Sequence, residues 1–146
     1  MKIYLSGPLS GCTDEEIYGW RTQVQGALSP LGYEFTNATL RIWDKVHSRQ
    51  SYEYIVESDK TEIDQCDILL VNYSKLTCGV AQEEIYAWER SKIVLLVYLG
   101  APQNPWMNYH CDKSFNSLDE AIRLLQFAAQ NHFDKAQLKY FIQREL

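Results

Sequence analysis

Two places in the sequence put acidic side chains on helix faces that are otherwise apolar. Asp59 lies midway between Ile55 and Ile63, and residues four apart share one face of a helix. An ionised carboxylate that faces a core is costly unless it has partners. Asp59 is therefore either a solvated or capped acid at the rim of this stripe, or a site carboxylate. In the second case partial burial raises its pKa and makes it a proton donor.

The second place is the adjacent pair Glu83 and Glu84, which follows Gly79, where we expect a helix to open. Each glutamate shares a helix face with Val80, so periodicity does not choose between them. A helix N-terminus favours the charged form of an acid in the first turns, which suits a carboxylate nucleophile. Acids are also common there for the simpler reason that they complement the helix dipole.

Two carboxylates that meet over a pocket, one ionised and one protonated, can cleave a glycosidic bond. One attacks the anomeric carbon or stabilises its positive charge, and the other protonates the leaving group. From the spacing of Asp59 and Glu83 alone this chemistry is a hypothesis, because spacing does not show that the two acids meet.

The elements that must position these acids alternate between strands and helices. Thr13 and Glu16 form a capping box ahead of an amphipathic stretch that ends near Ser29. We expect strands at residues 2–5, 33–36, 67–72, 92–98 and, at a sheet edge, 113–115. We expect helices at residues 14–28, 51–65, 79–91 and 117–125 and in the tail after 131, with loops at 37–50 and 100–109.

This alternation, with strands apolar on both faces, predicts a parallel sheet covered by helices on both sides. Four or five strands in 146 residues fit a single flavodoxin-like, doubly wound α/β domain over residues 1–146, with a mostly parallel sheet. Ligands of such sheets bind where the winding reverses, at the carboxyl ends of the strands. The loop at residues 7–12 is thereby expected beside the loop at 73–79.

The loop at residues 7–11 holds two glycines but neither a Gly-x-Gly-x-x-Gly fingerprint nor a Walker A lysine, which argues against a dinucleotide or nucleoside triphosphate. It is either a tight strand-to-helix turn or a backbone cradle for a sugar or phosphate, with Ser10 as a hydroxyl donor. Ser6 stands where a phospho-receiver domain needs an acid, so we set that class aside.

Composition excludes several other classes. A net charge of −5, from 14 basic and 19 acidic side chains, argues against a duplex-DNA partner. No apolar run approaches the length of about 18 residues that spans a membrane, and the start does not resemble a secretory signal, so we expect a cytoplasmic protein. Four scattered cysteines and three histidines predict reduced thiols and no metal site.

Three segments, taken in order, resemble the nucleoside 2-deoxyribosyltransferase family, which includes the related deoxynucleoside 5′-monophosphate N-hydrolases. Residues 2–8 resemble its opening strand and glycine loop. Asp59, followed by Ile63 and Cys66-Asp67 before an apolar strand, resembles its acidic helix. Residues 79–87, followed by Lys92-Ile93-Val94, resemble its catalytic segment. The similarity covers residues 2–98 and continues more weakly to 121.

The resemblance implies a retaining double displacement without metal or organic cofactor. Its register makes Glu83, rather than Glu84, the nucleophile that attacks C1′ of a 2′-deoxyribose. Asp59 is then the proton donor to the leaving base, and Tyr4 is the hydrogen-bond partner of the nucleophile. The glycosyl-enzyme meets either a second base, which gives transfer, or water, which gives hydrolysis. The alternative from another class is a catalytically silent nucleotide-binding or sensor module on this fold.

The substrate implied by the resemblance is a small deoxynucleoside or deoxynucleotide, not a nucleic-acid polymer. The family's small apolar residue and glycine after the nucleophile are replaced here by Glu84 and Ile85. Thr77 stands where nucleoside-using transferases often have an aspartate and the monophosphate hydrolases a serine. A neutral hydroxyl tolerates a phosphate that a carboxylate repels, which favours a nucleotide. The residues predicted to bind substrate are Ser6, Gly7, Pro8, Ser10, Gly11, Thr77, Gly79 and Asn108.

Family members are oligomers in which a neighbouring chain completes the pocket, so the resemblance implies a homo-oligomer with a shared active site. The aromatic loop at residues 106–110 and the tail helix at about 132–146 are the candidate contacts. The alternative for the tail is that it packs on its own domain.

Overall fold

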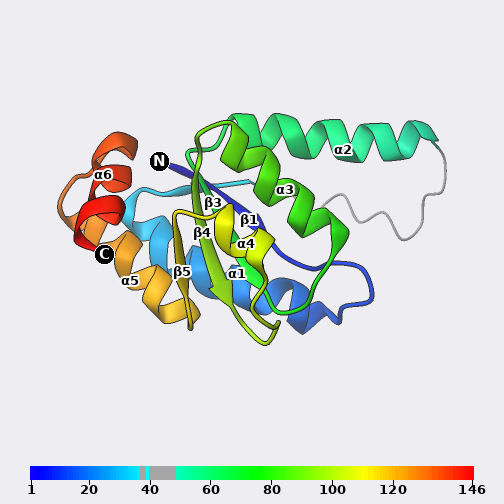
Figure 1. Cartoon of the computed structure of the whole chain (residues 1–146), viewed down its shortest axis with the longest axis horizontal. Helices are drawn as coiled ribbons and strands as arrows, with labels where there is room; N and C mark the ends of the chain where they lie inside the picture. Colours follow the sequence, from blue (N-terminus) through cyan, green and yellow to red (C-terminus); the bar gives the residue numbers. More distant parts are fainter. Residues whose placement is uncertain (37–38, 40–48) are drawn as a thin grey trace.

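The computed structural model of the chain (Figure 1) describes residues 1–36, 39 and 49–146; most of the loop expected at 37–50 lies outside these residues. The strands are β1 (Lys2–Ser6), β2 (Glu34–Phe35), β3 (Ile68–Tyr73), β4 (Ile93–Tyr98) and β5 (Lys113–Phe115). The helices are α1 (Asp14–Leu28), α2 (Arg49–Asp64), α3 (Cys78–Glu89), α4 (Pro105–Tyr109), α5 (Leu118–Gln130) and α6 (Lys135–Glu145), and a 3₁₀ turn spans Ser29–Leu31.

The strands form one sheet in the order β2-β1-β3-β4-β5, and every neighbouring pair is parallel. This is the flavodoxin-like strand order, with the winding reversed between β1 and β3, so the fold class expected from the sequence is confirmed. Ile68 of β3 lies opposite Ile3 of β1 and Ile93 of β4. All residues of β3 and β4 are buried, which explains their continuous apolar sequences.

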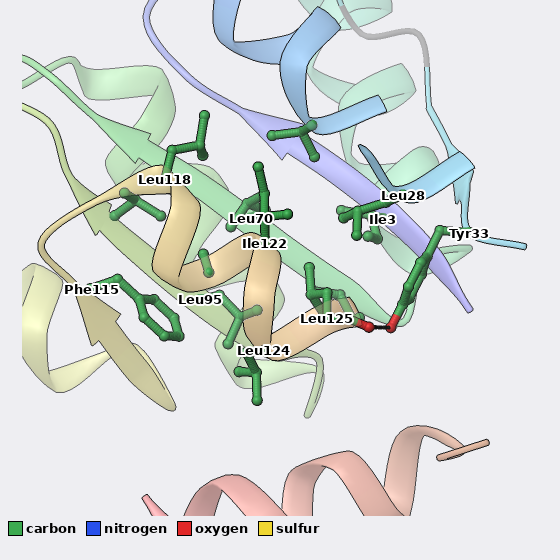
Figure 2. Packing of buried hydrophobic residues seen from close by; sticks show 14 of the residues in the cluster. Ile3, Leu28, Tyr33, Leu70, Leu95, Phe115, Leu118, Ile122, Leu124 and Leu125 are labelled. Carbon is green, nitrogen blue, oxygen red and sulfur yellow. Dashed lines mark hydrogen bonds between the residues drawn. The ribbon is translucent and has the colours of Figure 1, made fainter. Parts of the chain in front are cut away.

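Side chains that alternate along the strands supply two cores, one on each face of the sheet. Ile3 and Leu5 of β1 pack with α1, α5 and α6, whereas Tyr4 between them packs with α2, α3 and α4. Figure 2 shows the first core, in which the Tyr33 hydroxyl donates a 2.7 Å hydrogen bond to the Leu125 carbonyl of α5. The helices that pack in the second core include α2, which contains Asp59, and α3, which contains Glu83.

Hydroxyl caps fix where the helices begin. The Thr13 side chain accepts from the amide of Glu16 at the start of α1, in keeping with the cap read from the sequence. Thr77 accepts in the same way from the amide of Val80, so α3 begins at Cys78, one residue before the glycine expected to open it. α5 runs five residues beyond the predicted end at 125, because Ala128 is still buried on its core face.

The loop predicted over residues 100–109 is confirmed up to residue 104 but wrong beyond it, because the five-residue helix α4 occupies 105–109 and takes in most of the aromatic loop expected at 106–110. The Asn104 side chain accepts from the amides of Trp106 and Met107, and Pro105 at the first helical position has a backbone already set for a helix. Met107 is the buried residue that ties α4 to the second core.

The tail forms α6, whose Leu138 and Ile142 enter the first core. Lys139 adds a 3.5 Å ion pair with the nearly buried Asp112. α6 therefore packs on its own sheet, while its Tyr140 is exposed, and its contact with a second copy of the chain stays a prediction. In the described ranges, no helix has both the length and the apolar character needed to cross a membrane.

Candidate active site

A cavity of about 530 Å³ lies at the carboxyl ends of β1 and β3, where the winding reverses. The loop after β1, one face of α2 and the start of α3 line it, so the two loops expected side by side do meet. The predicted site residues on its wall are Tyr4, Gly7, Ser10, Asp59, Thr77, Gly79 and Glu83.

The other predicted residues do not line this cavity. Ser6 is buried at the end of β1, behind the wall, and Pro8 is also buried, whereas Gly11 is exposed with a positive φ of 70° at the far end of the loop. Asn108 lies on α4, where its amide nitrogen donates a 2.7 Å hydrogen bond to Gln103. Within one chain, therefore, Asn108 is not part of the cavity wall.

The carboxyl group of Glu83 is buried beneath the cavity, and its pKa is raised to about 7. Burial is the largest cause and the negative charge of Asp59 the next, whereas hydrogen bonds from Ser6 and Tyr4 and the positive charge of Arg21 act in the opposite direction. Oγ of Ser6 and Oε2 of Glu83 nevertheless lack a hydrogen bond of good geometry within the described chain, so the Ser6 contact is a weak one. Burial thus acts against the charged form that the N-terminus of α3 is expected to favour.

Glu84 is also buried, at 1% exposure, but it does not line the cavity. It lies near Tyr98 and Cys111, and burial alone raises its pKa to about 8. Of the two acids that periodicity could not separate, Glu83 therefore faces the cavity and Glu84 faces a core.

Asp59 reaches the cavity from α2, a different helix from the one that carries Glu83. The two helices are joined at their C-terminal ends. Nε of Arg90, just beyond α3, lies 3.2 Å from the Asp64 carboxylate of α2, and the Tyr86 hydroxyl of α3 donates to the same carboxylate at 3.0 Å. These exposed contacts tie the helix that carries Asp59 to the helix that carries Glu83.

Arg21 is a cavity residue that the sequence analysis missed. Its guanidinium is buried, with the side chain 6% exposed, and lies 4.6 Å from the ring centre of Trp20. The signal was present, because Arg21 falls within the apolar stripe of α1, four residues after the buried Ile17 and three before Val24. A charged residue within an apolar helix face indicates a candidate site residue, which is the pattern that identified Asp59.

Gly7 is the tightest point of the first loop. A Cβ at this position would lie 2.7 Å from Cζ2 of Trp20 and 3.3 Å from Cβ of Asn72. The chain can pass between these two side chains because residue 7 has none. This packing brings the loop backbone against the end of β1, next to Ser6.

Gly7→Ala is therefore expected to lower the free energy of unfolding by about 1–3 kcal/mol, because the buried indole must shift. Gly26→Ala is the matched control, since an added Cβ in this helical position of α1 meets nothing within 4 Å. It should raise stability by about 0.5–1 kcal/mol. Urea unfolding of both variants checks this, and equal stability of Gly7→Ala and wild type would contradict the packing described.

No group of three or more His, Cys, Asp or Glu side chains is placed to hold a metal ion among the residues described. The four cysteines, Cys12, Cys66, Cys78 and Cys111, are all free thiols.

Comparison with known proteins gives the class to which this architecture belongs. The sequence matches no protein-family model and no curated protein. The structure is similar to a 2-deoxyribosyltransferase from Bacillus psychrosaccharolyticus, with a TM-score of 0.68 and 19% identity over 94% of this chain and 96% of that one. It is also similar to a CMP N-glycosidase from Clostridium botulinum, with a TM-score of 0.58 and 15% identity over 87% and 99%.

A third similar structure, a conserved protein from Enterococcus faecalis, has a TM-score of 0.68 and 14% identity over 86% of this chain and 97% of that one. The chain thus has the fold of 2-deoxyribosyltransferase and N-glycosidase structures, over nearly the full length of each. The resemblance found in the three sequence segments is confirmed at the level of fold.

Proposed function

We propose that this chain cleaves the N-glycosidic bond of 2′-deoxynucleosides or their 5′-monophosphates and transfers the deoxyribosyl group to another base. One observation carries the proposal: carboxyl groups from two helices, Glu83 and Asp59, line one cavity and lie close enough for each to feel the other's charge. The names of two similar structures, a 2-deoxyribosyltransferase and a CMP N-glycosidase, describe chemistry of this kind and support the proposal.

In the proposed reaction, ionised Glu83 attacks C1′ of the deoxyribose, and the C1′–N bond breaks. The base leaves with the bonding electron pair and takes a proton from Asp59. The Tyr4 hydroxyl, hydrogen-bonded to Glu83, orients the attacking carboxylate. A second base then attacks C1′ of the ester, gives its proton back to Asp59 and releases Glu83 as a carboxylate. Two displacements at the same carbon retain its configuration.

A 5′-monophosphate suits this cavity better than an unphosphorylated nucleoside. The Thr77 oxygen accepts a hydrogen bond from the amide of Val80, so its own O–H remains to donate to a phosphate oxygen. Thr77, Cys78 and Gly79 line the cavity at the N-terminus of α3, where the helix dipole favours a negative charge. No aspartate stands at residue 77 to repel the phosphate.

The rate is expected to depend on pH through Glu83. Its pKa of about 7 means that the nucleophile is protonated in acid, so kcat/KM should fall about tenfold per pH unit below that value. Measuring kcat/KM from about pH 5 to 8 checks this. A deoxynucleoside substrate is the control, because a phosphate monoester itself titrates near pH 6. A flat profile with both substrates would contradict the assignment of Glu83.

The direct test is chromatography of protein incubated with deoxynucleosides and deoxynucleoside 5′-monophosphates, each with and without a second free base. A new nucleoside or nucleotide that forms only with the acceptor base supports transfer. Free base and deoxyribose 5-phosphate formed without an acceptor would make the protein a monophosphate N-glycosidase. Unchanged substrates, together with thermal stabilisation by a nucleotide, would make it a binding or sensor module.

A further inference from the structure

Arg21 is a buried charge at the cavity that the proposed reaction does not use. Among the described residues it is the only lysine or arginine on the cavity wall. It reaches the wall from α1, on the opposite face of the sheet from α2 and α3, which carry Asp59 and Glu83. A buried cation is costly unless it has partners, so the contacts of Arg21 should explain why it lies at the cavity.

The guanidinium of Arg21 is bound to backbone carbonyls. Nη1 donates to the Ile17 carbonyl at 2.6 Å, which anchors the side chain to its own helix. Nη2 donates to the carbonyls of Leu5 and Gly7 at 3.4 Å each. These two carbonyls flank Ser6, so one planar group holds both sides of the turn that lies against Glu83.

Arg21 also supplies the positive charge near Glu83. The groups that act on Glu83 come from each element around it: Asp59 from α2, Tyr4 and Ser6 from β1, and Arg21 from α1. Only Arg21 among them is positive. Burial lowers the pKa of Arg21, but Glu83 and Tyr4 raise it, and a guanidinium stays protonated in proteins. Its positive charge therefore favours the ionised form of Glu83.

We propose that Arg21 is a positioning residue for Glu83, which holds the turn after β1 in place and supplies the charge that lets Glu83 ionise beside Asp59. The catalytic meaning of this role rests on the function proposed above, whereas the electrostatic role does not. The proposed steps move no proton to or from Arg21, and its hydrogen bonds are to backbone carbonyls.

The test is a carbon-13 NMR titration of the Glu83 carboxyl in glutamate-labelled protein, with the resonance assigned by its loss in Glu83→Gln. Arg21→Gln removes the charge and keeps an amide donor, whereas Arg21→Lys keeps the charge. We expect Arg21→Gln to raise the pKa of Glu83 by about half a unit, because other groups act on it more strongly, and Arg21→Lys to leave it near the wild-type value. Arg144→Gln, an exposed site on α6, is the matched control and should cause no shift.

Kinetics separate this role from a merely structural one. If the pKa of Glu83 rises by half a unit, kcat/KM of Arg21→Gln falls about threefold at acidic pH and recovers at alkaline pH, with rescue by Arg21→Lys. An equal loss at every pH, or an unshifted Glu83 resonance in Arg21→Gln, would overturn the proposal. Circular dichroism checks folding, and Arg21→Met, which is also neutral, replaces Arg21→Gln if that variant does not fold.

The two proposals fail in different ways. Absence of turnover in the wild type with every candidate substrate, while Arg21→Gln still shifts the Glu83 titration, would overturn the proposed function and leave the role of Arg21 standing. Turnover in the wild type, with a Glu83 titration that is the same in all Arg21 variants, would overturn the role of Arg21 alone.

Discussion

Glu83→Gln is expected to lose turnover by roughly four orders of magnitude or more, because an amide cannot form the ester with C1′. The substitution keeps the size of the side chain and its place on the cavity wall. Initial rates of base release, measured with the best substrate found by chromatography, give the loss directly. Mass spectrometry of intact protein quenched during turnover should show a deoxyribosyl adduct in the wild type and none in Glu83→Gln.

The neighbouring acid is the natural control for this experiment. Glu84→Gln makes the same chemical change one residue along α3, at a side chain that does not line the cavity, and should keep most of the activity. The loss of activity expected in Glu83→Gln is not due to unfolding. The pKa of Glu83 is raised in the folded protein, so its ionisation destabilises the fold, and glutamine does not ionise. Nearly full activity in Glu83→Gln, or loss in both variants alike, would remove Glu83 as the nucleophile.

The regular features of this fold were predictable because they depend on repeated local patterns. Fully apolar runs predicted β3 and β4, and their alternation with amphipathic stretches predicted the parallel sheet and the place of the ligand crevice. The short helix α4 was missed because five residues are too few to show a period. Its signal is the single cap at Asn104 followed by Pro105.

The candidate site was predictable only in part, because burial depends on tertiary packing. Asp59 was found because an acid interrupts an apolar stripe, and Arg21 interrupts one in the same way but was passed over. Periodicity left Glu83 and Glu84 open because α3 is covered on two sides, one by the cavity and one by a core. The raised pKa of each acid follows from that burial, which no local pattern shows.

Glu84→Gln is expected to stabilise the fold, and the gain should grow with pH. Burial raises the pKa of Glu84 from about 4.5 in the unfolded chain to about 8, and its Oε1 has no hydrogen-bond partner in the described residues. The folded state therefore holds the proton more tightly than the unfolded state. The stability that this proton provides is complete below about pH 4.5 and is lost as the pH rises to about 8.

Because glutamine does not ionise, Glu84→Gln avoids this loss. We expect wild type and variant to have similar free energies of unfolding at pH 4.5, and the variant to be more stable by about 4 kcal/mol at pH 8. Urea unfolding at both pH values measures the difference. Glu89→Gln, at the exposed end of the same helix, is the control and should change stability equally at both.

A difference between wild type and Glu84→Gln that does not vary with pH would show that Glu84 is not protonated in the folded chain. The expected result has a consequence for Glu83, whose pKa is raised by the same burial in the adjacent position of α3. Glu83→Gln should also gain stability as the pH rises from about 4.5 to about 7, while it loses activity. Opposite effects on stability and turnover are expected of a carboxylate kept in an apolar site for its chemistry. Glu84→Gln should gain stability and keep activity. Comparing the two variants therefore distinguishes the effect of removing a buried carboxyl group from the effect of removing the nucleophile.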